Sequence, residues 1–226
     1  MQALSNADIL IYNSNGMERW VKQAVKAADN KKLITVEASK GIKLIGLTDL
    51  DLIIEHGRYD PHTWLSLSCA QAEVKNIAQA LAQADPANAD FYKKNAQVYH
   101  LKLQELLLKY QTLFAQIPQK NFVTGHAAFA YLCRDFDLQQ QSIEDVFASG
   151  EPSAQNLAKL TAYCKEHNVK TIFVEEAVSP KTSETLAREV GATTQEIYTI
   201  ECSNGEKTYL TRMEENLDAI YKSLKQ

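Results

Sequence analysis

The stretch from Asp85 to Pro118 reads DPANADFYKKNAQVYHLKLQELLLKYQTLFAQIP. Apolar residues recur along it at helical spacing, and after Pro86 no glycine or proline interrupts the pattern until Pro118. About 30 helical residues span roughly 45 Å at 1.5 Å per residue, which is long for a helix inside one small domain. The stretch therefore predicts a single long helix over residues 85–117.

Strand-like and helical patterns alternate on both sides of this segment, which is typical of parallel sheets covered by helices. Before it, residues 7–13 and 33–36 are predicted strands, residues 18–28 a helix, and Ile53 and Ile54 a strand that leads into a polar loop. After it, the predicted strands are 121–124, 171–174 and 196–200, and the predicted helices are 127–136, 153–166, 183–190 and 209–224.

We therefore expect an α/β protein of two lobes, each with a parallel sheet, joined by one long rigid helix. The N-terminal lobe would cover residues 1–84, the connecting helix 85–117 and the C-terminal lobe 118–226. A coiled-coil arm is the alternative for the long helix, but a connector is favoured because α/β patterns flank it on both sides.

Composition narrows the classes of function. The 226 residues carry a formal net charge of −4, whereas a mainly electrostatic nucleic-acid binder should be basic, so we expect no nucleic-acid partner. No apolar run approaches the ~18 residues of a membrane span. The four cysteines form no CxxC pair, which argues against a thiolate zinc finger and favours buried thiols over a disulfide.

Three polar residues follow predicted strands, where ligands bind in open α/β sheets. His126 comes after strand 121–124, Glu201 ends strand 196–200, and His62 follows the polar loop after Ile53 and Ile54. Pro61 suits the first turn of a helix with Asp60 as its N-cap. Imidazole nitrogen and carboxylate oxygen suit zinc, and with more oxygen they suit manganese, although a lone histidine at a strand end is often only a polar cap.

Four sequence motifs resemble those of a known family. Residues 60–65 read DPHTWL and are similar to a DPHxWL signature, and residues 123–132 read VTGHAAFAYL and are similar to VTSHxAFxYL. Two more stretches resemble segments of the same family and occur in the same order along the chain. They are residues 5–20, which contain SNADILIYN and GMERW, and residues 209–217, which read YLTRMEENL. The whole chain resembles the zinc/manganese solute-binding proteins of bacterial metal ABC transporters (the cluster A-I family).

The resemblance implies two α/β lobes joined by one long helix, with the metal held between them. It implies that His62 and His126 are metal ligands and that Glu201 is the carboxylate ligand, with Glu196 and Glu206 nearby. Zn²⁺ is the expected cargo and Mn²⁺ the alternative. The expected partner is the membrane permease of the transporter, and the expected location is the periplasm or, for a lipoprotein, the cell surface.

The chain departs from the family pattern in one respect. Family members carry a further histidine ligand upstream, but no histidine precedes His56 here. We therefore expect an incomplete N-terminal lobe that starts after that ligand, with a fourth metal position left to water or to His56. Glu175, which follows strand 171–174 beside Glu176, could also approach the pocket or line its rim. An exposed sheet edge would allow a dimer through this lobe.

Two other classes of function stay open. Two histidines, one glutamate and an open position form the pattern of some zinc-dependent hydrolases, but the sequence has no HExxH and no GxSxG motif. A surface adhesin is the second alternative, since some relatives of the family are described so. We expect capture of a metal rather than enzymatic catalysis, with affinity that falls as the pH drops through ~6.5, because histidine must lose its proton to bind.

Overall fold

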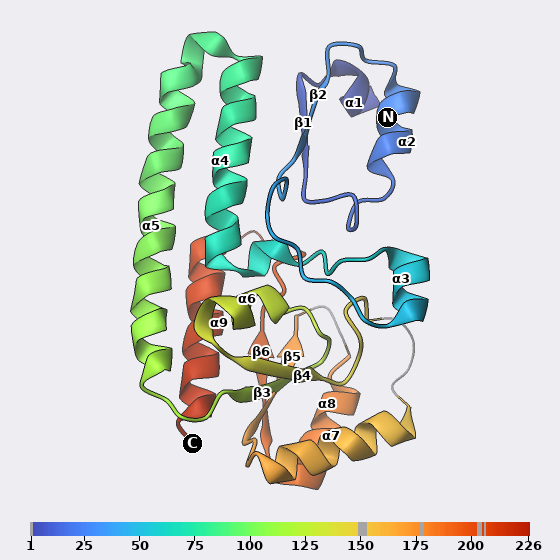
Figure 1. The fold of residues 1–226 in the computed structure, drawn as a ribbon, viewed down its shortest axis with the longest axis vertical. Coiled ribbons are helices and arrows are strands. Elements are labelled where there is room, and N and C mark those ends of the chain that lie inside the picture. Colours follow the sequence, from blue (N-terminus) through green and yellow to red (C-terminus); the bar gives the residue numbers. More distant parts are fainter. Residues whose placement is uncertain (1, 149–152, 177–178, 203–204, 206) are drawn as a thin grey trace. The chain divides into compact units, whose positions relative to one another are not determined.

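The structure is a computed structural model that describes residues 2–148, 153–176, 179–202, 205 and 207–226. The chain divides into two compact units, Met1–Glu105 and Leu106–Gln226 (Figure 1). The boundary falls inside the long helix α5, Ala89–Ala115. The first part of α5, residues 89–105, belongs to unit 1, and the second part, residues 106–115, belongs to unit 2.

Unit 1 is a pair of parallel strands with helices. Strands β1 (Ile9–Tyr12) and β2 (Ile34–Glu37) pair in parallel, with Ile9 opposite Ile34. The helical elements of the unit are α1 (Gln2–Asn6), α2 (Val21–Ala28), α3 (Leu50–His56), η1 (Thr63–Leu65), α4 (Leu67–Ala84), η2 (Pro86–Asn88) and the first half of α5. In α4, Asn76 donates to the carbonyls of Ala38 and Lys40, which follow β2.

Unit 2 is a four-stranded parallel sheet in the order β4-β3-β5-β6. The strands are β3 (Asn121–Thr124), β4 (Gln139–Ser142), β5 (Thr171–Glu175) and β6 (Thr193–Ile197). The helices are α6 (Ala130–Phe136), α7 (Ala154–Glu166), α8 (Lys181–Val190), α9 (Tyr209–Leu224) and the second half of α5. The prediction of parallel strands between helices is confirmed.

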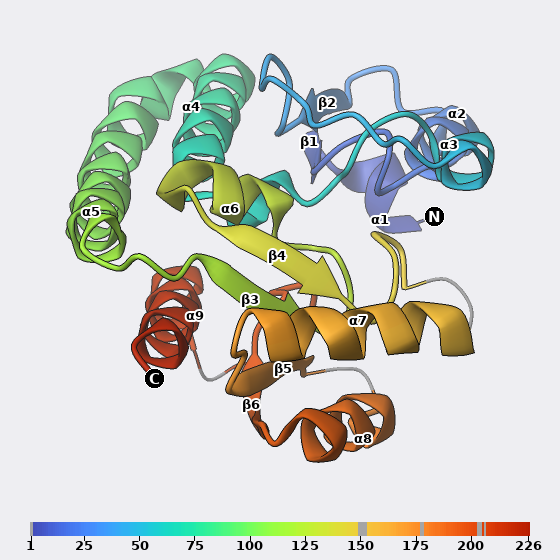
Figure 2. The same ribbon diagram turned by 60° about the horizontal axis from the view of Figure 1, so that its bottom comes forward.

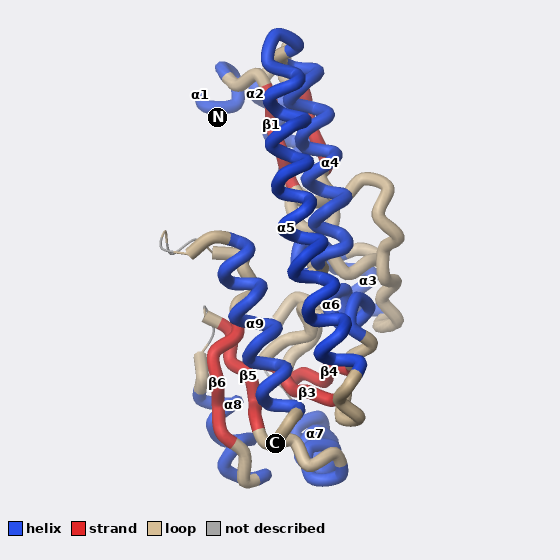
Figure 3. Tube along the Cα trace, turned by 90° about the vertical axis from the view of Figure 1, so that its left-hand side faces the viewer, coloured by secondary structure: helices blue, strands red, loops and turns tan. Residues whose placement is uncertain are grey.

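Helices cover both faces of this sheet (Figures 2 and 3). On one face Val123 and Ile172 pack in a cluster with Leu160 of α7 and Leu186 of α8. Neighbouring strand residues point the opposite way, so Phe122 and Phe173 stack edge to face, and Phe122 also contacts Phe129. Near the end of α5, Phe114 stacks on Phe136 of α6 and Tyr221 of α9.

The strand order places a ligand-binding position at the carboxyl ends of β3 and β5. The chain leaves β3 for β4 on one side and then crosses to β5 on the other side of β3. Crevices at such a reversal are where open α/β sheets bind their ligands. His126 follows β3 and Glu175 ends β5, so both lie at this switch point.

Two predictions about the segment before α4 are wrong. Ile53 and Ile54 belong to helix α3, not to a strand, because the carboxylate of Asp49 accepts the backbone N–H groups of Asp51 and Leu52 and caps that helix. Asp60 does not cap a helix; Ser66 caps α4 by accepting the N–H of Cys69. Short apolar runs fit either structure, so a local cap decided the outcome.

Strand limits in unit 2 also differ from the prediction. The last strand runs over Thr193–Ile197, so Glu201 lies four residues beyond it rather than at its end. Strand β4 was missed because its sequence, QQQS, has no apolar residue, and it lies at the edge of the sheet. The ends of α9 agree with the predicted helix 209–224.

The cysteines are thiols, as expected: Cys69, Cys133 and Cys164 are buried and Cys202 is exposed. Within the described part of the chain, no helix combines the length and the apolar character that crossing a membrane would require.

Candidate metal centre

His126 stands on a short loop whose backbone is held by three side chains of unit 2. Its carbonyl accepts from the Thr124 hydroxyl at 2.6 Å and from the Gln140 amide at 2.9 Å. Its N–H donates to Oε1 of Glu175 at 2.9 Å. The position of the histidine is thus fixed by partners from β3, β4 and β5.

Glu175 lies beneath the imidazole of His126. Its side chain is buried, and its Oε1 atom is 3.4 Å from Nδ1 of His126. Gly125 makes room for it, because a Cβ atom at residue 125 would overlap the carboxylate and would lie 3.0 Å from its carboxyl carbon. The sequence analysis left open whether Glu175 approaches the pocket or lines its rim. In the structure the Glu175 side chain is buried, because the absence of a side chain at residue 125 leaves room for it.

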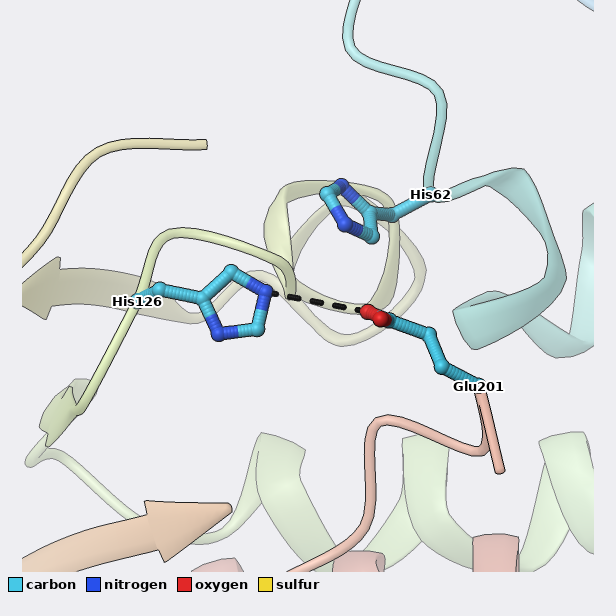
Figure 4. A group of neighbouring side chains, drawn as sticks. All are labelled: His62, His126 and Glu201. Atoms are coloured by element: carbon cyan, nitrogen blue, oxygen red, sulfur yellow. Dashed lines mark ion pairs between the residues drawn. The ribbon is translucent and has the colours of Figure 1, made fainter. Parts of the chain in front are cut away.

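The other ring nitrogen of His126 faces Glu201. Nε2 lies 3.9 Å from Oε1 of Glu201, as the dashed line in Figure 4 marks. Zinc–nitrogen and zinc–oxygen bonds are about 2.0–2.2 Å long, so two of them can join donor atoms up to ~4.2 Å apart through one ion. His126 and Glu201 can thus bind the same metal ion, with the Glu201 side chain partly exposed.

Acidic neighbours raise the pKa of His126. Burial by itself lowers the pKa, but Glu175 opposes it, and Glu201 and Glu144 add to the rise. Glu144, which the sequence did not single out, has a raised pKa of its own, mainly because of burial and then because Glu175 and Asp145 are near, against a lowering by His126. Negative charge around the imidazole favours a bound cation.

His62 belongs to unit 1, where Asp60 fixes its ring. The Oδ1 atom of Asp60 accepts the backbone N–H of His62 at 2.8 Å and lies 2.9 Å from its Nδ1. The first contact is a turn in which an aspartate side chain bonds the backbone two residues on. When Nδ1–H donates a hydrogen bond to this carboxylate, the lone pair of the neutral ring is on Nε2. Asp60 therefore selects the nitrogen that can bind metal.

The remaining expected residues have these positions. His56 is the last residue of α3, with its Nε2 atom 3.6 Å from Glu55. Glu196 lies exposed on β6, and Glu206 is outside the described residues. The sequence analysis did not find the contact of Asp60 with His62, although Asp60 stands in the DPH motif, which was the available signal.

Fold and side chains together define a class. Unit 2 is a parallel α/β sheet, and His126 and Glu201, on the loops that follow β3 and β6, can share one ion. Unit 1 carries a second histidine whose Nδ1 is likewise backed by a carboxylate. These are the features of an α/β metal-binding protein that uses nitrogen and oxygen donors.

Comparison with known proteins identifies the family. Residues 1–223 match the family described as zinc-uptake complex component A, periplasmic (ZnuA). A putative metal-binding protein of Treponema pallidum is 42% identical over 99% of this chain and 73% of its own length. The high-affinity zinc uptake system protein ZnuA of Bacillus subtilis is 41% identical over 98% of this chain and 73% of its own. This chain belongs to the ZnuA family.

Solved structures agree with this assignment. The laminin-binding adhesin Lmb of Streptococcus agalactiae, a mutant structure, has a TM-score of 0.90 at 34% identity and covers 99% of this chain and 83% of its own. A Zn(II)-bound mutant variant of AdcAII from Streptococcus pneumoniae has a TM-score of 0.89 at 35% identity, over 99% and 82%. The predicted fold class is confirmed, as is the predicted family.

Proposed function

We propose that this protein is an extracytoplasmic receptor that captures a divalent transition metal ion and delivers it to the membrane permease of an ABC importer. The observation that carries the proposal is the His126–Glu201 pair, with Glu175 behind the imidazole. Relatives named for zinc uptake and as zinc-binding lipoproteins support the cargo, the transporter and the location.

His62 is the proposed third ligand. Its Nδ1 faces Asp60, so Nε2 carries the lone pair that a metal needs. His126 has the same arrangement, with Glu175 on Nδ1 and Nε2 toward Glu201. Each histidine thus has its Nδ1 atom against a carboxylate, and the proposed ligand set is the two Nε2 atoms and the carboxylate of Glu201.

Zinc is the proposed cargo, and manganese is the alternative. Two imidazoles and one carboxylate are a nitrogen-rich set of the kind that zinc binds, with water or another side chain in the fourth position. Manganese prefers more oxygen donors. His56 remains a candidate for the fourth ligand.

The proposed mechanism is capture and release without catalysis. His62 and His126 bind as neutral imidazoles, so a protonated ring must lose its proton before the ion enters. The carboxylates of Asp60 and Glu175 keep each ring oriented, and they offset the positive charge that the ion brings. The permease then receives the ion.

A calorimetric zinc titration of the chelator-stripped protein at neutral pH tests this function. We expect one-to-one binding that is lost or weakened at least tenfold in His126→Ala, His62→Ala and Glu201→Ala. His100→Ala is the matched control, because His100 is an exposed histidine on α5. Wild-type protein that binds neither zinc nor manganese would refute the proposal. Hydrolase activity that a chelator abolishes would favour the enzyme alternative.

Attachment to laminin is a second candidate, because similar solved structures are titled laminin-binding proteins of Streptococcus agalactiae and Streptococcus pyogenes. Binding to immobilised laminin can be compared for wild type and His126→Ala. Saturable binding by both would add adhesion to metal capture, and no binding by either would remove it.

A further inference from the structure

Strand β5 ends at Glu175, and Glu176 follows it directly; the two glutamates serve different parts of the site. The two side chains have different hydrogen-bond partners. Glu175 faces His126, as described above. Glu176 instead accepts hydrogen bonds from the backbone of residues 199 and 200, on the loop that carries Glu201.

Both carboxylate oxygens of Glu176 are used in this contact. Oε2 accepts the N–H of Thr199 at 2.8 Å, and Oε1 accepts the N–H of Ile200 at 3.1 Å. Hydrogen bonds from N–H groups to an ionised carboxylate are among the strong ones in proteins. Both oxygens are thus turned to the backbone of the two residues that precede Glu201.

Ile200 has a left-handed backbone conformation with φ of 59°, so its backbone needs hydrogen bonds that stabilise this conformation. A β-branched residue in this region is an outlier that persists only when its surroundings enforce it. Ile200 immediately precedes Glu201. Its backbone conformation therefore sets the direction in which the Glu201 side chain leaves the loop.

Helix α9 holds the two ends of the same loop. The side chain of Asn216 accepts the N–H of Tyr198 at 2.8 Å and donates to its carbonyl at 2.7 Å. The buried Arg212 donates to the carbonyl of Cys202 at 2.5 Å. Between these two contacts, Glu176 binds the backbone of Thr199 and Ile200, and Ile200 is the residue with the left-handed conformation.

We propose that Glu176 is a positioning residue for metal binding, which holds the Thr199–Ile200 backbone so that Glu201 faces His126. The inference rests on the proposed function and deepens it. Residues that orient metal ligands typically change metal affinity 10- to 100-fold when they are removed. The carboxyl end of β5 would then prepare both ligands of unit 2, His126 through Glu175 and Glu201 through Glu176.

Zinc affinity of the full chain tests the role. We expect Glu176→Ala to weaken zinc binding 10- to 100-fold. Glu176→Gln should also weaken it, because an amide offers one acceptor oxygen for two N–H groups. Glu196→Gln, which removes a carboxylate from the exposed face of β6, is the control and should bind as wild type does. Thermal unfolding of each metal-free variant shows whether it is folded.

A double-mutant cycle separates positioning from a general structural effect. If Glu176 acts through Glu201, then Glu176→Ala in a Glu201→Ala background should change zinc affinity less than about threefold. Multiplicative losses would overturn the inference, as would a folded Glu176→Ala variant with wild-type affinity. If Glu176→Ala does not fold, the same cycle is run with Glu176→Gln.

Hydrogen exchange of the metal-free protein gives a readout that does not depend on zinc. We expect faster exchange of the amides of Thr199 and Ile200 in Glu176→Gln, and unchanged exchange at His126. Unchanged exchange at residues 199 and 200 would refute the holding role. Failure of the proposed function looks different, because then wild-type protein itself binds no metal.

Discussion

The carboxylate of Glu175 occupies the space that a side chain on residue 125 would fill, so Gly125 and Glu175 are sterically linked. The carboxylate can therefore reach both the backbone N–H and the Nδ1 atom of His126, 2.9 and 3.4 Å away. Gly125, which follows a strand like an ordinary turn residue, is thus part of the candidate metal centre. The role of Gly125 can be tested by substitutions that add a Cβ atom at this position.

Gly125→Ala should force Glu175 to move, destabilise the protein by about 1–3 kcal/mol, and weaken zinc binding. Gly125→Ser should cost less than Gly125→Ala, because a hydroxyl can donate to the displaced carboxylate and serine stands here in the motif that the chain resembles. Denaturant unfolding and calorimetry measure both effects. Equal stability of Gly125→Ala and wild type would contradict the steric argument.

Zinc affinity should fall as the pH is lowered, over a range that the pKa of His126 sets. Its pKa is raised, despite burial, by Glu175 and then by Glu201 and Glu144, so protons compete with zinc at pH values above 6.5. We expect affinity to drop about tenfold for each pH unit below the raised pKa. Titrations from pH 5.5 to 8.5 measure this, and Glu175→Gln should move the fall to lower pH.

The same raised pKa affects stability without metal, with the opposite dependence on pH. A histidine whose pKa is higher in the folded protein stabilises it below the unfolded pKa, and this stability is lost as the pH rises through the folded value. His126→Gln should therefore destabilise the metal-free protein more at pH 5.5 than at pH 8.5. A cost that is the same at both pH values would show that the imidazolium makes no net contribution.

Glu73 in α4 is buried at a cost to stability at neutral pH. Burial raises its pKa, although the hydroxyl of Thr63 lies 2.7 Å from its Oε1 atom and lowers the pKa. The protonated form stabilises the protein below the unfolded pKa, about 4.3 for glutamate, and this stability is lost as the pH rises through the higher folded pKa. Glu73→Gln should raise the melting temperature at pH 7.5 by about 2–4 °C, which corresponds to about 1 kcal/mol. No gain is expected at pH 4.

Helices α5 and α9 are joined by hydrogen bonds of a buried tyrosine and by a half-exposed ion pair. Tyr110 is fully buried, and its hydroxyl donates to Asp218 at 2.5 Å. Lys109 and Glu214 form a half-exposed ion pair at 2.6 Å. Tyr110→Phe should cost about 1–3 kcal/mol, whereas Lys109→Met should cost less than about 1 kcal/mol. Chemical denaturation of the two variants side by side measures the difference, and a larger loss for Lys109→Met would contradict it.

Local signals in the sequence were enough for most of the elements. The long helix α5, the strands β3 and β5 and the helix α9 all follow from the pattern of apolar residues. Where local signals were weak, the prediction failed. The polar strand β4 has no apolar face to detect, and the apolar pair in α3 fits a helix as well as a strand.

The sequence by itself determined the fold class and the family, and it singled out His62, His126 and Glu201 as candidate ligands. Periodicity, caps and motifs are properties of neighbouring residues, so they can be read directly. Only the tertiary structure decided what orients two of these residues. Glu175 reaches His126 across 49 positions, and Glu176 reaches Thr199 across 23. Such contacts exist only after parallel strands have brought distant loops to one edge of the sheet, which no local pattern encodes.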